Sequence, residues 1–308
     1  MQTATLKKSP TQNAALKNIQ QQVTDIIIQQ LEAGTIPWQQ PWSGSTQKLL
    51  GLPYNFTTRN YYQGMNIILL WCSSLKNNFT TDEWAGFQQW KDRGEAVRKD
   101  EKGSLIVYYT TLEKEVGDEI TKIPMLKSLK VFNRCQLVSH DPDKYQEEKP
   151  KKSLVEKIAV VDEFISNTGA IVEHHDGGAC YRPSCDKILM PYPEKFRDTV
   201  TCTATEGYYS STLHELIHWS GSSHRLNRTK GMKFGDQNYA IEELVAELGA
   251  AFLTAGFGLA TVEKGDHAGY IENWLKVIKE NNRSIFVAAG EASKAVEYLH
   301  HFGPENTL

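Results

Sequence analysis

The sequence predicts an α+β protein of two domains, residues 1–145 and 146–308. The length of 308 residues suits two ordinary domains or one large one. Each half combines segments of helical apolar spacing with short β-rich segments. Between the halves, the stretch HDPDKYQEEKPKKS at 140–153 is polar, charged and contains proline, as is typical of a domain boundary.

The first half opens with a predicted helix over residues 13–33, for which Gly34 is the expected stop. The next segment, IPWQQPW at 36–42, predicts an extended loop because its two prolines exclude a helix. Residues 60–75 then predict a turn that leads into a buried helix.

The rest of this half predicts one more helix and two strands. The segment TTDEWAGFQQWKDRG at 80–94 predicts a short helix, with Thr80 or Thr81 as its cap and Gly94 at its end. Residues 105–111 and 123–138 are β-rich and are expected to form paired strands.

The second half predicts mainly helices. One helix is expected near 154–168, and short strands with tight turns follow over 170–196. A helix carrying His-Glu-x-x-His comes next, then a strongly helical segment at 239–258 and an amphipathic helical tail at 270–302.

Composition excludes several classes of protein. No run of about 18 apolar residues exists, so we expect no membrane span, and the N-terminus lacks a secretory signal, so we expect a cytoplasmic protein. The five cysteines are odd in number and form no CxxC pair, which argues against a disulfide framework or a cysteine zinc cage. Net charge is −3, but residues 1–150 hold 18 Lys and Arg against 16 Asp and Glu, a mild excess that permits nucleic-acid binding.

The segment HELIH, residues 214–218, predicts a metal site. Residues four apart share one helix face, so His214 and His218 can bind one ion. Glu215 is offset by one position, where it can act as general base toward a water on that ion. The spacing also arises by chance in helices, but the apolar Leu213, Leu216 and Ile217 allow this helix to be buried.

Two residues compete to be the third ligand. His224 fits the longer pattern H-E-x-x-H-x-x-G-x-x-H, but that class needs a methionine turn, and Met232 is poorly placed for one. Glu243 lies on the next predicted helix, and we favour it over His224. Glu247 lies one turn later and is expected to orient a ligand histidine, while Glu242 is expected to be solvated.

Aromatic residues concentrate in the first half. Single-stranded nucleic acid is held by stacking on aromatic rings and by cationic contacts to phosphates. The competing explanation is that most of these rings form core. The residues proposed to contact DNA are Trp38, Trp42, Arg59, Tyr61, Tyr62, Arg98, Lys99 and Lys102.

In order along almost the whole chain, several segments resemble the ArdC family of plasmid-borne antirestriction proteins, which is also similar to the N-terminal part of some plasmid primases. They are IPWQQPW, GLPYNFTTRNYYQGMNIILL, GEAVRKDEKG, VFNRCQ, CDKILMP and HELIHWSGSSHRLNR followed by YAIEELVAE. The resemblance implies an N-terminal α/β domain that binds single-stranded DNA and a C-terminal zincin-like metallopeptidase domain. It implies His214, His218 and an acidic residue of the second helix as ligands, Glu215 as catalytic acid–base, and protection of incoming DNA during conjugation.

We therefore expect a zinc peptidase, or one using another divalent ion such as Mn²⁺, that binds single-stranded DNA. Its protein substrate would be a restriction enzyme or another DNA-bound protein. The alternative is a stoichiometric DNA shield in which the metal is structural. A nuclease is disfavoured, because two-metal nucleases need several converging carboxylates.

Overall fold

A computed structural model describes residues 10–39, 51–116, 119–141, 154–199, 202–228, 237–260 and 267–303. Trp42, one of the predicted DNA contacts, lies outside these residues. The elements of the first half are α1 (Pro10–Glu32), β1 (Tyr54–Asn55), α2 (Met65–Asn77), β2 (Glu83–Gly86), α3 (Phe87–Asp92), β3 (Ser104–Val116), β4 (Glu119–Asn133) and the short 3₁₀ helix η1 (Arg134–Gln136). Those of the second half are α4 (Leu154–Asn167), β5 (Ile171–His175), β6 (Cys180–Arg182), β7 (Lys187–Pro191), η2 (Pro193–Lys195), α5 (Ala204–Ser220), α6 (Gln237–Phe257), α7 (His267–Glu280) and α8 (Ser284–His300).

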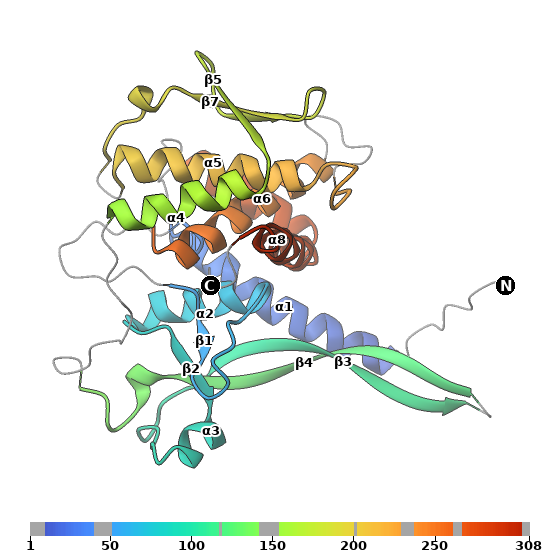
Figure 1. Ribbon diagram of the computed structural model, residues 1–308. Coiled ribbons are helices and arrows are strands. Elements are labelled where there is room, and N and C mark those ends of the chain that lie inside the picture. Colours follow the sequence, from blue (N-terminus) through green and yellow to red (C-terminus); the bar gives the residue numbers. More distant parts are fainter. Residues whose placement is uncertain are drawn as a thin grey trace.

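The first half is built on a four-stranded sheet in the order β1-β2-β4-β3. The predicted pairing of two strands is confirmed, because β3 pairs antiparallel over its whole length with residues 119–131 of β4. They form the long ribbon at the base of Figure 1. β3 is an edge strand of this sheet, and α2 lies against it: the Asn66 side chain accepts from the N–H of Val107 and donates to its C=O, both at 2.8 Å.

The helix predicted over residues 80–94 is wrong in its first half. Residues 83–86 form β2, which pairs with β1 on one side and β4 on the other, and only then does α3 begin. Pairing on both edges and burial of Trp84 beneath α2 outweigh the local acidic and capping signals. The predicted helical tail is also two helices, which separate at residues 281–283.

The second half places α5 between a small sheet and other helices. The three-stranded sheet has the order β5-β7-β6, so β6 is an edge strand. In Figure 1 this sheet lies over α5, while α6 and α8 lie on the other side. α5 and α6 pack closely, since Gly249 of α6 brings its backbone against the Ile217 side chain of α5.

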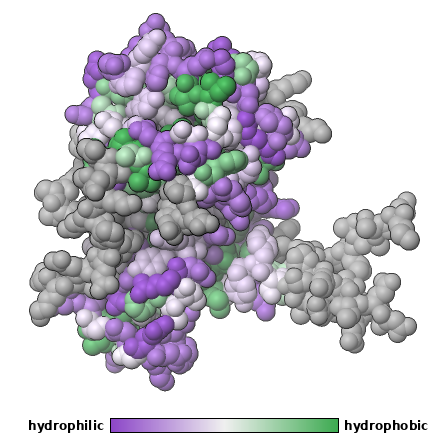
Figure 2. All heavy atoms as spheres, in the orientation of Figure 1, coloured by the Kyte–Doolittle hydropathy of each residue, from purple (hydrophilic) through white to green (hydrophobic). Residues whose placement is uncertain are grey.

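One hydrophobic core joins both halves. It runs from Val23 and Ile27 of α1 through the α5 and α6 side chains to α8. Trp71 of α2 contacts Phe252 of α6, with ring centroids 5.7 Å apart. On the face drawn in Figure 2, hydrophilic side chains surround small apolar patches. Within the described ranges, no helix combines the length and apolar character that a bilayer span requires.

Candidate metal centre and peptidase site

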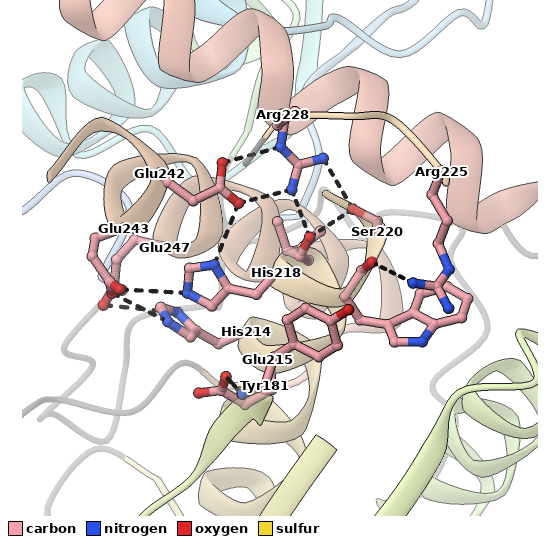
Figure 3. A network of polar contacts seen from close by, with 12 residues as sticks. Tyr181, His214, Glu215, His218, Ser220, Arg225, Arg228, Glu242, Glu243 and Glu247 are labelled. Atoms are coloured by element: carbon pink, nitrogen blue, oxygen red, sulfur yellow. Dashed lines mark hydrogen bonds and ion pairs between the residues drawn. The ribbon is translucent and has the colours of Figure 1, made fainter. Parts of the chain in front are cut away.

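Two packed helices position the candidate metal ligands. α5 begins with a capping box in which the Thr203 side chain accepts from the Glu206 N–H, and the Glu206 carboxylate accepts from the Thr203 N–H at 3.1 Å. His214 and His218 then lie one turn apart on one face of α5, with ring centroids separated by 4.9 Å. Glu243 points at both from α6 (Figure 3).

The three side chains form a compact donor set. Glu243 Oε2 lies 3.6 Å from His214 Nε2, and Glu243 Oε1 lies 3.6 Å from His218 Nε2. Their ligand atoms all lie within 4.8 Å of one another, and in the part of the chain described here this is the only such cluster. Two imidazoles and one carboxylate, with a fourth position for water, suit catalytic zinc. The residues therefore fit a divalent ion.

The charges in this cluster balance one another. Burial alone would raise the pKa of the Glu243 carboxyl, but hydrogen bonds from His214 and His218 hold that pKa far below its usual range. Burial alone would lower the pKa of His218, but Glu242 and Glu243 raise it to about 10. A proton on His218 therefore occupies the place where a metal ion would bind, and the ion must displace it.

Glu215 lies beside the ligands without joining them. Its carboxylate is buried, and Oε2 accepts a 2.7 Å hydrogen bond from the backbone N–H of Tyr181 on the edge strand β6. Figure 3 shows this contact on the side of the helix away from Glu242. The α5 helix thus presents two metal ligands and a separately held carboxylate, which is the arrangement a general base requires.

His224 is not brought to the cluster. Its side chain is 60% exposed, and Nε2 lies 3.4 Å from Asp186 Oδ2. Asp186 also binds Arg225 through two hydrogen bonds of 2.9 and 2.6 Å. The Arg225 guanidinium stacks on Trp219, with its central carbon 3.4 Å from the ring centroid. Arg225 therefore fixes the β6–β7 turn against the end of α5.

The prediction that Glu242 is solvated is wrong. Its carboxylate is buried, and Oε1 lies 3.3 Å from His218 Nδ1. The burial arises because this turn of α6 packs against the end of α5 and against Arg228. Glu247 lies 4.0 Å from His214 Nδ1 and also accepts a 3.4 Å hydrogen bond from Gln39. Each histidine therefore has a second carboxylate near its Nδ1, at 3.3 Å for His218 and at 4.0 Å for His214.

Other polar residues near α5 have local partners. The Tyr208 hydroxyl lies 3.0 Å from His174 Nε2, and the two rings are stacked. His175 bonds the carbonyl of Gly178. His174 and His175 are thus both hydrogen-bonded within this region. Tyr239 is half-buried on α6.

Six of the eight predicted DNA contacts fall into three groups. Trp38 is buried in the main core, so the expectation that it stacks on bases is wrong. Arg98 is exposed, but its guanidinium donates to the carbonyls of Cys135 and Leu137 and pairs with Glu101, so it stabilises a loop. Exposed side chains with room for a ligand are Arg59, Tyr61, Lys99 and Lys102.

Arg59 and Tyr61 lie on a cationic and aromatic surface. The Arg59 guanidinium lies 4.7 Å above the Phe56 ring. Phe56 in turn stacks on Trp90, with centroids 4.9 Å apart. Tyr61 is 39% exposed, whereas burial of the half-buried Tyr62 raises its pKa. Sequence reasoning missed Arg134, whose guanidinium lies 4.4 Å from the Phe56 centroid, because nothing in its flanking residues indicates this contact.

Comparison with known proteins identifies the family. A family model described as the N-terminal domain of anti-restriction factor ArdC matches residues 17–132, and one described as a zincin-like metallopeptidase matches residues 159–291. The crystal structure of the ArdC protein of plasmid R388 without metal is 34% identical, with a TM-score of 0.75, and the match covers 92% of this chain and 97% of that one. The chain belongs to the ArdC antirestriction family.

Further relatives agree with this assignment. The Mn(II)-bound structure of R388 ArdC is 33% identical, with a TM-score of 0.72, and the match covers 94% of this chain and 99% of the R388 chain. An uncharacterized protein of Sinorhizobium fredii is 32% identical over 92% of each chain. The DNA primase TraC of Escherichia coli is 30% identical over 93% of this chain, which spans only 27% of that primase. The zincin-like fold, the donor set and the Mn(II)-bound relative together indicate a divalent metal.

Proposed function

We propose that this ArdC protein is a zinc-dependent metallopeptidase that also binds single-stranded DNA and protects incoming DNA during conjugation. The convergence of His214, His218 and Glu243 beside a separately held Glu215 carries the peptidase part. Zinc is the proposed ion because two imidazoles and one carboxylate are a common catalytic zinc set, and Mn²⁺ is the alternative that the Mn(II)-bound relative supports.

The residues around the site supply the steps of amide hydrolysis. When bound, the ion would supply Lewis-acid activation of a water molecule and of the amide carbonyl. Glu215 takes a proton from the attacking water and later gives it to the leaving amine. The Tyr181 N–H fixes one Glu215 oxygen, so the other is the proton acceptor. The target would be a restriction enzyme or another DNA-bound protein.

Glu215→Gln separates the peptidase from a DNA shield. With the zinc-loaded protein and dye-labelled casein, we expect cleavage by wild type and at least a 10²-fold lower rate for the variant, because a general base contributes about 10²–10⁴-fold. Metal content should stay unchanged, since Glu215 is not a ligand. The control is Glu163→Gln, an exposed carboxylate on α4. Absence of wild-type cleavage, or equal cleavage by Glu215→Gln, contradicts the peptidase.

The same variant decides what the metal is for in the cell. Transfer of unmodified DNA into a restricting recipient should lose its protection with Glu215→Gln. If protection persists while casein cleavage is lost, the protein acts as a stoichiometric shield and the metal is structural. The proteolytic and the protective roles are thus measured independently of each other.

The proposed DNA surface contains Arg59, Tyr61, Lys99 and Lys102. Its support is an exposed tyrosine beside an arginine that lies over an aromatic ring. Tyr61→Ala should weaken binding of a fluorescent oligothymidine by roughly 5–150-fold, since stacking contributes about 1–3 kcal/mol per base. Arg59→Ala should reduce the slope of log affinity against log salt by about 0.7. Tyr192→Ala, at a comparably exposed tyrosine of the second half, is the control. Unchanged affinity in Tyr61→Ala would remove this surface.

A further inference from the structure

A buried ion pair lies directly behind His218. Arg228 Nη2 is 3.0 Å from Glu242 Oε1, and Arg228 Nε is 3.2 Å from Glu242 Oε2 (Figure 3). The side chains are only 4% and 5% exposed. Two hydrogen bonds in parallel are the geometry in which a guanidinium holds a carboxylate most firmly. The charge of Glu242 is thus compensated inside the protein.

Arg228 is itself fixed by the end of α5. Its Nη2 donates to the Ile217 carbonyl at 2.6 Å, and Nη1 donates to Ser220 Oγ at 3.1 Å. The Arg228 backbone N–H closes the loop by donating to the Gly221 carbonyl at 2.9 Å. The guanidinium therefore satisfies backbone groups that a helix end leaves unpaired. With these bonds it cannot move aside without breaking several contacts at once.

Glu242 determines which nitrogen of His218 faces the metal site. Its Oε1 lies 3.3 Å from Nδ1, while Nε2 lies 3.6 Å from the ligand Glu243. A hydrogen bond from Nδ1–H to a carboxylate fixes the ring orientation and leaves the Nε2 lone pair for an ion. Arg228 holds the carboxylate that holds the ring.

Gly221 is a glycine for reasons of space. Its φ of −80° and ψ of −5° are accessible to any residue. A Cβ at this position would lie 2.7 Å from Arg228 Nη2, 3.0 Å from Arg228 Cζ and 3.1 Å from Glu242 Oε1. Any side chain would therefore displace the Arg228–Glu242 pair. The glycine of the pattern H-E-x-x-H-x-x-G has a role here that does not involve His224.

We propose that Arg228 and Glu242 are positioning residues that orient His218 toward the metal, and that Gly221 leaves the space their ion pair occupies. This inference rests on the proposed metal site, and it adds residues that act through a ligand without touching the ion. It predicts that Gly221 and Arg228 are energetically coupled, because the two shortest contacts of an added Cβ, at 2.7 and 3.0 Å, are both with the Arg228 guanidinium.

A double-mutant cycle on the full chain tests the coupling. Apparent zinc affinity is measured by competition with a chromogenic chelator for Gly221→Ala, Arg228→Ala and the double variant. Each single change should weaken zinc binding by about 10–100-fold, as is typical when a group that orients a ligand is lost. The double variant should be no weaker than Arg228→Ala alone. Gly290→Ala on α8, where a Cβ would meet nothing within 4 Å, should bind zinc as wild type does.

Two further measurements keep the outcome decisive. The visible spectrum of the Co²⁺-loaded protein should change in Gly221→Ala, which a general loss of stability would not cause. Should Arg228→Ala fail to fold, Glu242→Gln by itself tests the positioning of His218, with the same expected 10–100-fold loss. Wild-type affinity in Gly221→Ala, or equal losses from Gly221→Ala in both backgrounds, overturns the inference alone. Failure of the wild type to bind zinc, Co²⁺ or Mn²⁺ overturns the proposed metal site as well.

Discussion

Substitution of Gly249 by alanine should destabilise this protein, although alanine is the better helix former. Gly249 lies inside α6, where alanine ordinarily gains about 1 kcal/mol over glycine. Here a Cβ would lie 2.7 Å from Ile217 Cδ1, 2.8 Å from Cγ1 and 3.2 Å from Cγ2. Normal carbon–carbon contacts are about 3.5–4.0 Å, so α5 and α6 must separate or Ile217 must leave its rotamer.

The magnitude follows from comparing two glycines. Overpacking of a core costs about 1–3 kcal/mol. Gly290 lies inside α8, and a Cβ there would meet nothing within 4 Å. Gly290→Ala should therefore gain the helix propensity of alanine without any overpacking. The free energies of unfolding of the two variants should therefore differ by about 1–3 kcal/mol, with Gly249→Ala the less stable. For a chain of 308 residues the matching difference in Tm is roughly 1.5–5 °C.

Thermal unfolding followed by circular dichroism measures this difference on the metal-free protein. Adding Ile217→Ala to Gly249→Ala removes all three short contacts, so the double variant should be more stable than the sum of the single losses predicts, by about 0.5–3 kcal/mol. Zinc affinity should fall in Gly249→Ala, because α5 carries His214 and His218 while α6 carries Glu243. If Gly249→Ala melts at or above the temperature of Gly290→Ala, the argument from the α5–α6 contact is refuted.

Two other predictions concern the ion. Glu243→Ala should lose about one bound zinc per chain, because a direct ligand is lost, whereas His224→Ala should keep its zinc. Mass spectrometry of the metal content measures both variants. Loss of zinc in His224→Ala would instead make His224 the third ligand, as in the pattern H-E-x-x-H-x-x-G-x-x-H. Because the pKa of His218 is raised to about 10, a zinc ion that binds at neutral pH displaces a proton, and zinc affinity should rise roughly tenfold per pH unit between about pH 6.5 and 9. The stability of the metal-free fold should depend on pH in the opposite direction. The contribution of protonated His218 to that stability is complete below about pH 6.5 and is lost as pH rises through about 10. Titration calorimetry in two buffers of different ionisation enthalpy should count about one proton released per zinc, and a count of zero would contradict the assignment.

Sequence patterns predicted correctly those helices and strands whose conformation is set by residues nearby in the chain. Helical spacing and Gly34 placed the first helix within three residues of α1 at each end, and the β-rich segments became β3 and β4. The segment at 80–94 failed because its strand character depends on partners from β1 and β4, which are distant in sequence. A helix-capping pattern depends on about four neighbouring residues, whereas a central strand is stabilised by hydrogen bonds to a strand on each side.

The same distinction applies within the metal centre. The i, i+4 spacing of His214 and His218 is a property of one helix, and so it was readable from sequence. Glu242 faces His218 because of the way α6 packs against α5 and because the chain folds back after α5, which brings Arg228 to the end of that helix. The role of Gly221 is hidden for the same reason: its backbone angles are ordinary, and only the three-dimensional contacts show what occupies the space above it.

The metal centre also depends on the first half of the chain. Gln39, from the IPWQQPW loop, donates at 3.4 Å to Glu247, and Glu247 lies 4.0 Å from His214. Gly64, before α2, donates its N–H to Ser293 of α8 at 2.7 Å. Because the main core includes α1, α2, α5, α6 and α8, removing the first half would expose apolar surface along the helices that hold the ligands. The site that would bind the metal is therefore stabilised by the same half of the chain that carries the proposed DNA surface.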